Sequence, residues 1–253
     1  MPETHTRKPL SRIQGAAPAG ATDSQSAARA IQEMFTAIAP RYDLLNHLLS
    51  ANVDKLWWWR TALTLGPVLS QPNARVLDLC CGTGDMAFAL WREAPRAQIV
   101  GADFSHAMLK LASVKSGDPK ALQWIEADAL ELPFPDQSFD LVTSAFGFRN
   151  LADYDAGLRE IRRVLKSGGV VGILEFSQPG GLLGKLYKFY FKRILPRIGR
   201  IVSRTAAYSY LPASVERFPS PQQLLERMRA ADFHHVSWTP YTLGIAGLFY
   251  GMR

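Results

Sequence analysis

The sequence is poor in cysteine and has no long apolar run. Its only two cysteines, Cys80 and Cys81, are adjacent, so they cannot link distant segments, and they fit a reducing cytoplasm. No stretch of about 18 uncharged apolar residues occurs, which argues against a membrane-spanning helix. The five histidines are scattered, and none has zinc-ligand spacing to the cysteines. We therefore expect no structural disulfide between distant segments, no membrane span and no metal site.

Acidic residues are also in short supply, since 29 Lys and Arg face 22 Asp and Glu, for a net charge of +7. This balance favours a negatively charged partner surface, either anionic lipid or nucleic acid. The 253 residues, 47% of them apolar, suffice for one large α/β domain with an N-terminal extension. Residues 1–26 are rich in Ala, Gly, Pro, Ser and Thr and lack the apolar stretch of a secretory signal, so we expect them to be disordered.

Residues 27–72 predict a helical cap that precedes the main domain. Helices are expected over 27–39, 41–50 and 53–65, with Pro40 ending the first. The third helix carries Trp57, Trp58 and Trp59, and consecutive helical side chains point about 100° apart. They cannot all face one core, so we expect at least one to line a ligand cavity or lid, although packing against the domain is the simpler interpretation for any single one.

Residues 73–253 alternate between strand and helix patterns, which is typical of a parallel sheet covered on both faces. Apolar or β-branched runs predict strands, and amphipathic runs predict helices. The tail predicts an antiparallel hairpin around Gly244, and residues 166–169 predict a turn at the end of a helix. The expected strands are 76–80, 98–103, 122–128, 139–144, 170–176, 235–242 and 245–252, and the expected helices are 85–92, 105–115, 153–165 and 220–231.

A glycine-rich turn follows the first of these strands. Gly82 and Gly84 lie between the strand and a helix, where a ligand can approach the backbone closely. The spacing Gly82-x-Gly84-x-x-Ala87 fits the loose dinucleotide fingerprint. However, Asp78 and Asp85 flank the turn, and two carboxylates would repel a diphosphate and attract a cationic ligand. We therefore expect S-adenosylmethionine (SAM), with its sulfonium and ammonium groups, rather than NAD. Asp85 could equally be a helix-start residue that complements the helix dipole.

Acidic residues also end the next two strands. Asp103 is placed to accept both ribose hydroxyls of a nucleoside, a feature that NAD and SAM sites share. Asp128 could accept the adenine amino group, or it could be only a turn residue. A set of acids at three strand ends (Asp78 or Asp85, Asp103 and Asp128) is harder to obtain by chance than a single acid, and the set supports a nucleoside site.

Residues 181–215 contain seven Lys and Arg and no acid, interleaved with apolar and aromatic residues. The pattern indicates a basic amphipathic helix, broken at Pro196, that would lie in a lipid interface or cover an apolar substrate pocket. An ordinary helix packed on its own domain is the alternative. We favour contact between residues 181–204 and an anionic membrane over nucleic-acid binding, because no nucleic-acid reader motif accompanies the charge.

Several stretches together resemble the ubiquinone/menaquinone biosynthesis C-methyltransferase family. The resemblance spans about residues 30 to 253 and rests on residues 42–50 (Tyr-Asp-Leu-Leu-Asn-x-x-x-Ser), 77–85, 132–140, 144–150 (Ser-x-Phe-Gly-Phe-Arg-Asn) and 163–169. The sequence departs from the family pattern at Asp54, where His is usual, at Ser167 in a turn, and at Cys80 and Cys81. The Asp54 difference leaves a role for that position in doubt.

The resemblance implies a class I SAM-dependent methyltransferase fold, Rossmann-like, with a seven-stranded, mostly parallel sheet and an antiparallel last strand. It implies methyl transfer to a ring carbon of a prenylated quinol, either a demethylmenaquinol or a ubiquinol precursor, by a protein in the cytoplasm at the membrane periphery. A homodimer or a biosynthetic complex would fit. The expected cofactor contacts are Asp78, Gly82, Thr83, Gly84, Asp85, Asp103, Phe104, Asp128, Ala129 and Ser144.

Carbon methylation needs a hydroxyl of the ring to ionise, because the phenolate pushes electron density onto the ring carbon. Arg149 is our candidate for stabilising the phenolate, with a structural ion pair as the alternative role. Tyr42 and Asn46 lie one helical turn apart and would cap the pocket. The rival functions are a methyltransferase of another lipophilic or phenolic molecule such as a sterol, an NAD-dependent oxidoreductase, and a non-catalytic membrane-associated protein that keeps the fold.

Overall fold

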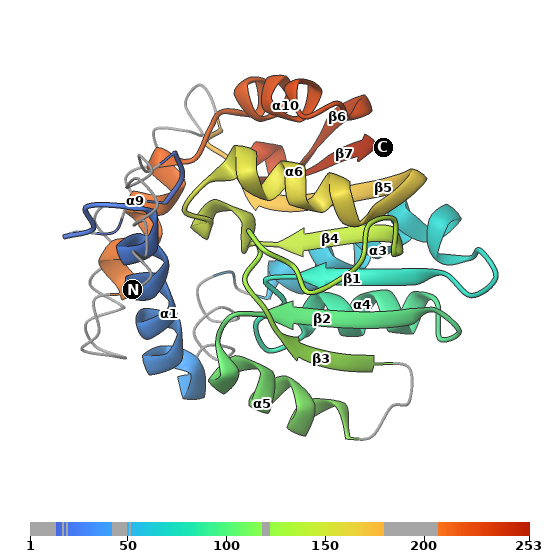
Figure 1. Cartoon of the computed structure of the whole chain (residues 1–253), viewed down its shortest axis with the longest axis horizontal. Helices are drawn as coiled ribbons and strands as arrows, with labels where there is room; N and C mark the ends of the chain where they lie inside the picture. The colour runs from blue at the N-terminus through green and yellow to red at the C-terminus, as the bar shows by residue number, and fades with distance from the viewer. Residues whose placement is uncertain are drawn as a thin grey trace, which may run out of the picture.

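The computed structural model describes residues 14–16, 18, 20–41, 50, 52–117, 122–179 and 207–253. At its centre lies one seven-stranded sheet with the order β3-β2-β1-β4-β5-β7-β6 (Figure 1). Strands β1 to β5 run parallel to one another, and β7 is antiparallel to both β5 and β6. The strands are β1 (Arg75–Leu79), β2 (Gln98–Asp103), β3 (Leu122–Glu126), β4 (Phe139–Ala145), β5 (Leu165–Phe176), β6 (His234–Tyr241) and β7 (Ala246–Met252). The predicted fold class and the C-terminal hairpin are thereby confirmed.

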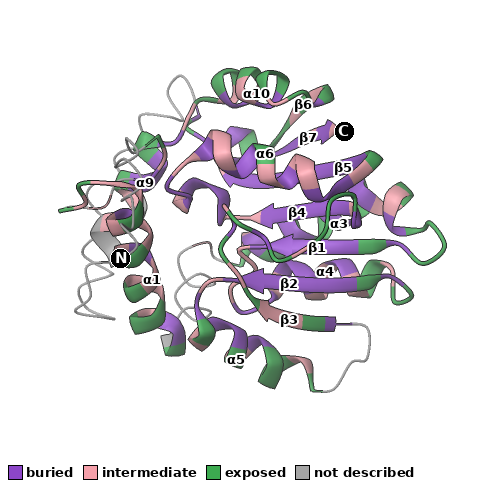
Figure 2. Cartoon of the chain, in the orientation of Figure 1, coloured by how far each residue is buried: buried purple, intermediate pink, exposed green. Residues whose placement is uncertain are grey.

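Helices cover both faces of the sheet. In the view of Figure 1, α6 lies in front of the sheet, whereas α3 and α4 lie behind it. This cover explains why the central strands read as apolar runs, and Figure 2 shows them buried over most of their length. The described helices are α1 (Ser24–Ile38), α3 (Val53–Leu69), α4 (Asp85–Glu93), α5 (His106–Ser116), α6 (Tyr154–Val164), α9 (Ala207–Arg217) and α10 (Pro221–Ala230), with short 3₁₀ turns η1 (Ala39–Arg41), η2 (Phe148–Asn150) and η4 (Thr242–Gly244).

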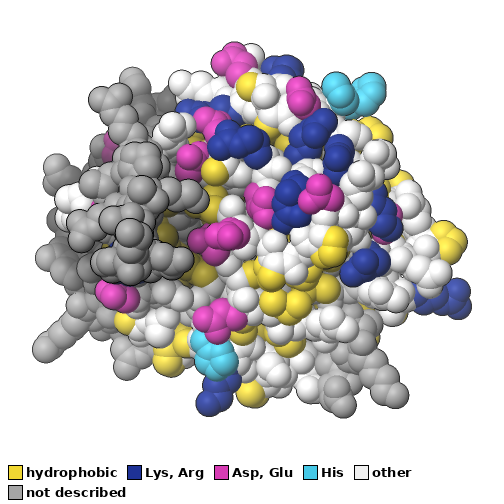
Figure 3. Space-filling view, viewed as in Figure 1, with side chains coloured by type: hydrophobic (Ala, Val, Ile, Leu, Met, Phe, Trp, Pro, Cys, Tyr) yellow, Lys and Arg dark blue, Asp and Glu magenta, His cyan; other side chains and the backbone are white. Residues whose placement is uncertain are grey.

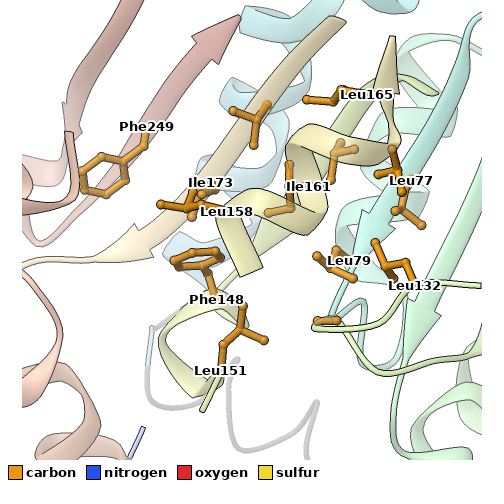
Figure 4. Close-up of a cluster of buried hydrophobic side chains, with 14 of the residues drawn as sticks. Leu77, Leu79, Leu132, Phe148, Leu151, Leu158, Ile161, Leu165, Ile173 and Phe249 are labelled. Carbon is orange, nitrogen blue, oxygen red and sulfur yellow. The ribbon is translucent and has the colours of Figure 1, made fainter. Parts of the chain in front are cut away.

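The sheet separates two apolar cores. On one side, Leu158 and Ile161 of α6 pack against Leu77 and Leu79 of β1 and Ile173 of β5 (Figure 4). On the other side, α3 and α4 pack against the sheet through residues that include Trp57, Leu65 and Leu90. Successive side chains of β1 and β5 point to opposite faces of the sheet, so each of these strands contributes to both cores.

The N-terminal region is more structured than the composition predicts. Asp23 caps α1, and its side chain and that of Ser26 form a reciprocal capping box. Earlier in the chain, Gln14 pairs with Asp153, and the Ala16 N–H donates to the Leu151 carbonyl at 2.7 Å. The disorder expected for residues 1–26 is therefore wrong for these described residues, because backbone pairing holds a segment that has little apolar content of its own.

The tryptophans of α3 divide as the 100° spacing requires. Trp57 and Trp58 are buried, and Trp59 is exposed. Trp57 packs at ring-centroid distances of 5.7 Å from Phe146 and 6.0 Å from Phe176. The expected helix over 41–50 lies mostly outside the described residues, and α3 itself continues to Leu69, past the predicted end at residue 65.

The structure corrects the turn that was predicted for residues 166–169. These residues belong to β5, where the register against β4 shifts so that Phe139 pairs with Leu165 but Leu141 pairs with Val170. Gly168 has a φ of +76° and its N–H donates to the carbonyl of Arg253. Pairing with the end of the chain therefore turns a local turn signal into an irregular stretch of strand.

Two glycines with similar backbones offer a stability test. An alanine Cβ at Gly84 (φ +88°) would lie 2.5 Å from Trp124 Cη2, whereas one at Gly168 (φ +76°) would meet nothing within 4 Å. We expect Gly168→Ala to lower the free energy of unfolding by about 1 kcal/mol through backbone strain alone. Gly84→Ala should cost about 3 kcal/mol, because overpacking adds to the same strain. Urea unfolding of both variants measures the difference, and equal losses would contradict the role assigned to Trp124.

Candidate functional site

The cleft lies where the direction of the sheet order reverses. Strands β2 and β3 follow β1 on one side and β4 lies on its other side, so the loops that leave the carboxyl ends of β1 and β4 diverge. A cleft of about 710 Å³, including open solvent at its mouth, occupies this position. Its walls include Gly82 after β1, Asp103 and Phe104 at the end of β2, and Asp128 and Ala129 after β3. Ligands of open α/β sheets bind at this position, outside the carboxyl ends of the strands.

The loop after β1 is shaped by residues in the left-handed region. Gly82 has a φ of +54° and Gly84 one of +88°, which glycine adopts without strain. Cys80 also has a positive φ (+54°) and lines the cleft. Burial raises the pKa of its thiol well above the ordinary value, so Cys80 is an apolar wall residue rather than a nucleophile.

Asp103 is the best-placed acceptor in the cleft. The Gly82 N–H donates to its Oδ2 and the Ser105 N–H to its Oδ1, each at 2.9 Å. Each carboxylate oxygen keeps a second lone pair, so the two together can still accept from a vicinal diol. Burial raises the pKa of Asp103 to about 6, although the Ser105 and Gly82 N–H groups oppose the rise. The residue thus fits the ribose-binding role predicted from its place at the strand end.

Asp128 faces the same cleft from the next loop. Its Oδ1 accepts the Leu130 N–H at 2.9 Å, which fixes the carboxylate beside the buried Ala129. A fixed carboxylate can accept from an exocyclic amino group. The structure therefore brings together five of the predicted cofactor residues on one cleft: Gly82, Asp103, Phe104, Asp128 and Ala129.

Lys115 changes the electrostatic argument for the glycine turn. Its Nζ lies 2.8 Å from Asp85 Oδ1 and donates to Thr83 Oγ1 at 3.2 Å. Asp85 is therefore ion-paired, and its charge is not left over to attract a cation. Lys115 stands 30 residues after Asp85 in the chain, at the end of α5, and no local sequence signal links the two.

Asp78 and Ser144 are not among the residues that line the cleft. Asp78 is fully buried, and Thr143 Oγ1 donates to its Oδ1 at 2.9 Å. Burial raises the pKa of Asp78 to about 7, and the charges of Asp103 and Asp85 add to the rise. Ser144 Oγ is buried without a hydrogen bond to any described residue. Direct contact of Asp78, Thr83, Gly84, Asp85 and Ser144 with a cofactor stays a prediction.

Helix α1 closes one side of the cleft, a contribution that the sequence did not reveal. Ala28 and Phe35 line the cleft directly. Gln32 Nε2 donates to the Phe104 carbonyl at 2.5 Å, and the hydroxyl oxygens of Thr36 and Ser105 lie 3.0 Å apart. The helix is thereby attached to the turn that follows Asp103. Phe35 lies in the helix predicted over 27–39, but nothing in the sequence pattern indicated that this ring faces a ligand site.

Arg149 is buried in an ion pair. Its Nη1 lies 3.1 Å from Glu175 Oε2 and also donates to the Phe146 carbonyl, while its backbone N–H donates to Glu175 Oε1 at 3.0 Å. Burial raises the pKa of Glu175, and the guanidinium opposes that rise. The geometry therefore matches the ion-pair alternative, and contact between Arg149 and a substrate stays a prediction. Tyr42 and Asn46 lie outside the described residues.

Next to this pair, the cleft has a polar corner. Asn150 lines the cleft, and the hydroxyl of Tyr210 in α9 donates to its Oδ1 at 3.0 Å. Burial raises the pKa of Tyr210 to about 12, so the phenol stays protonated at neutral pH and acts as the donor. The Asn150 amide is thereby oriented by a residue 60 positions later in the chain.

Comparison with known proteins decides the family. The profile of the ubiE/COQ5 methyltransferase family matches residues 22–253. The chain belongs to this family. It is 50% identical over 232 residues to demethylmenaquinone methyltransferase of Deinococcus radiodurans, covering 90% of this chain and 95% of that protein. It is 49% identical to the protein of the same name from Thermus thermophilus, over 87% of this chain and all of that one.

Other relatives carry a broader name. The ubiquinone/menaquinone biosynthesis C-methyltransferase of Geotalea daltonii is 43% identical, over 88% of this chain and 96% of that protein. Among solved structures, a SAM-dependent methyltransferase of Thermotoga maritima superposes with a TM-score of 0.60 at 20% identity, covering 87% of this chain and 99% of that one. Family and fold together make this chain a SAM-dependent methyltransferase, so its cofactor is SAM.

The pKa of Asp103 predicts how SAM binding depends on pH. An acceptor of two ribose hydroxyls must be ionised, and the carboxyl group becomes protonated below pH 6. We expect the SAM dissociation constant to rise about tenfold from pH 7 to pH 5, a range below the pKa of an α-amino group. Isothermal titration calorimetry measures it. Asp103→Asn should bind weakly with a flatter pH profile, and Asp78→Asn, which removes the other raised acid, should keep the slope. An affinity constant between pH 5 and pH 7 in the unsubstituted protein would contradict the assignment.

Proposed function

We propose that this protein transfers a methyl group from SAM to a ring carbon of a prenylated quinol, demethylmenaquinol first and a ubiquinol precursor second. The observation that carries the proposal is the 50% identity to a demethylmenaquinone methyltransferase over 232 residues. The family match over residues 22–253 supports it, because that range includes every residue that lines the cleft described above. The nearest rival is a SAM-dependent methyltransferase of another lipophilic or phenolic molecule.

The chain's own residues supply binding and orientation. Asp103 accepts the ribose hydroxyls, and Asp128 accepts the adenine amino group, so the nucleoside end is held by two strand ends. When bound, SAM supplies an electrophilic methyl group on a positive sulfur. The acceptor ring then has to lie in line with that group, and its hydroxyl has to lose a proton so that the carbon becomes nucleophilic.

Polar and apolar groups of the cleft suit such a ring. The Tyr210 hydroxyl holds Oδ1 of Asn150 and so orients the amide. The amide N–H groups of Asn150 can then donate to a ring oxygen. Leu79, Phe146 and Leu151 line the cleft nearby and exclude water from an apolar ring and tail. Tyr42 and Asn46 would cover the ring from the segment before α3. We propose that Arg149 acts mainly by holding the segment from Phe146 to Asn150 in place.

The first experiment tests the substrate class. The purified protein is incubated with SAM and demethylmenaquinol in detergent micelles, and the product is analysed by mass spectrometry. We expect one added methyl on the ring and one S-adenosylhomocysteine for each product molecule. Parallel reactions with a ubiquinol precursor, a sterol and a simple phenol test the rivals. Turnover of a sterol or phenol in preference to both quinols would replace the proposed substrate, and binding of NADH instead of SAM would overturn the reaction class.

The second experiment separates the two roles of Arg149. Arg149→Met leaves the buried Glu175 carboxylate without its cation and should destabilise the protein by about 3–5 kcal/mol. The double variant Arg149→Met/Glu175→Gln removes both charges and should regain most of that stability. We expect its turnover to remain at least about tenfold below that of the unsubstituted protein, because the hydrogen bond to the Phe146 carbonyl is still missing.

A comparison of SAM affinity with quinol turnover shows whether Arg149 acts in the reaction or only in stability. Thermal unfolding, SAM affinity by calorimetry and quinol turnover are measured on each variant. SAM affinity should change little in the double variant, since Arg149 is not among the residues that line the cleft. Full recovery of turnover would remove Arg149 from the reaction altogether.

Membrane contact and assembly also remain proposals. The basic segment 181–204 lies outside the described residues, so its expected contact with anionic lipid rests on its charge pattern alone. None of the helices within the described ranges combines the length and apolarity that crossing a bilayer requires. A homodimer or a biosynthetic complex stays a prediction as well, as does a cytoplasmic location.

A further inference from the structure

Helix α3 is apolar on both of its sides, which is unusual for a helix at a protein surface. Its inner side packs into the core through Trp57, Leu65 and Leu69. Its outer side exposes Leu56 (53%), Trp59 (55%) and Leu63 (41%), which follow each other at helical spacings of three and four residues. Among the large apolar side chains that the structure describes as exposed, these three form the only run on a single helix. We call Leu56, Trp59 and Leu63 the outer α3 face.

The charges around the outer α3 face have one sign. Lys55 and Arg60 are exposed beside it, and neither forms an ion pair with an acid in the described part of the chain. The only acid of α3, Asp54, is buried. The Arg60 guanidinium lies 4.5 Å from the centre of the Tyr241 ring, which fixes one of the cations at the edge of the face.

The surface over α6 and α10 does not share this pattern. In Figure 3, cations and acids alternate over α6 and α10. There, Arg163 pairs with Asp136 and Arg227 with Asp155, each at 2.7 Å. Mixed charge of this kind suits contact with water, whereas a combination of Trp, Leu, Lys and Arg without an acid suits the boundary between lipid headgroups and acyl chains.

The outer α3 face also adjoins the rim of the cleft. Trp57, next to Leu56, contacts Phe146 of the cleft wall at a centroid distance of 5.7 Å. Its Nε1 donates to Thr242 Oγ1 at 2.8 Å, and the following residue, Leu243, is 80% exposed. Leu243 keeps a positive φ of +57° to reach this position. Trp57 thus connects the cleft wall to the surface turn that carries Leu243.

We propose that the outer α3 face, with Leu243, is a docking surface for an anionic lipid bilayer. Leu56, Trp59 and Leu63 insert among the acyl chains near the headgroups, while Lys55 and Arg60 contact lipid phosphates. The inference deepens the proposed function, because docking here brings the cleft rim to the membrane in which a prenylated quinol is dissolved. It is separate from the expected contact of residues 181–204, and it uses only described residues.

The test measures binding to vesicles that contain no quinol. The full chain is mixed with phosphatidylglycerol/phosphatidylcholine vesicles, and the bound fraction is measured by sedimentation. We expect Leu56→Ser/Trp59→Ser/Leu63→Ser to weaken binding at least about tenfold, because three apolar side chains no longer enter the lipid. The matched control is Val114→Ser, which removes an exposed apolar side chain (75% exposed) from α5 and should leave binding unchanged. A triple variant that binds as tightly as the unsubstituted chain would overturn the proposal.

Two further measurements distinguish insertion into a bilayer from self-association of the chain. Brominated lipids should quench a component of the fluorescence that Trp59→Phe removes, and the absence of such a component would contradict insertion at this face. Sedimentation equilibrium tests whether a second copy covers the face instead. A dimer that the triple variant dissociates, with unchanged vesicle binding, would assign the face to self-association. Methyl transfer to a short-chain quinol in solution should be the same in the triple variant, so loss of docking and failure of the proposed reaction remain distinguishable.

Discussion

The carboxylate of Asp103 is the constraint on which the site depends. It accepts N–H groups from Gly82, after β1, and from Ser105, after β2, so that two loops from neighbouring strands share one acceptor. Burial makes its charge costly, and the same N–H groups offset part of that cost. The Ser105 hydroxyl in turn contacts Thr36 of α1. A single acid at a strand end therefore sets the glycine loop, the next turn and the covering helix relative to one another.

Family membership and geometry account for different parts of the function. Solved methyltransferases at about 20% identity share the sheet and its helices, which establishes the fold alone. The relatives at 43–50% identity match over almost their whole length. The family match spans residues 22–253, so it also covers α1, the segment 146–152 and α9. These are the parts that build the cleft beyond the nucleoside. Substrate preference is accordingly expected from these segments rather than from the loop after β1.

Much of the fold could be predicted from the sequence because buried parallel strands are short apolar runs and the helices between them are amphipathic. Asp103 at the end of β2 and Asp128 after β3 could be picked out for the same reason, since their places follow from the ends of predicted strands. SAM was the right cofactor, but part of the reasoning was wrong: Asp85 is paired with Lys115, and Asp78 is buried with a raised pKa. Contacts between residues about 30 positions apart leave no local pattern. The same holds for Arg149 and Glu175, and for β5 at residues 166–169, where pairing with Arg253 overrides a turn signal.

The attachment of α1 has a thermodynamic consequence. The helix supplies a wall of the cleft through Phe35, and it is hydrogen-bonded through Gln32 to the backbone directly after Asp103. A nucleoside bound at Asp103 would share this turn with α1, so any effect of the nucleoside on the docking of α1 would be matched by an equal effect of that docking on nucleoside affinity. Ligand affinity of the cleft and the resistance of the N-terminal helix to proteolysis would therefore report the same coupling free energy.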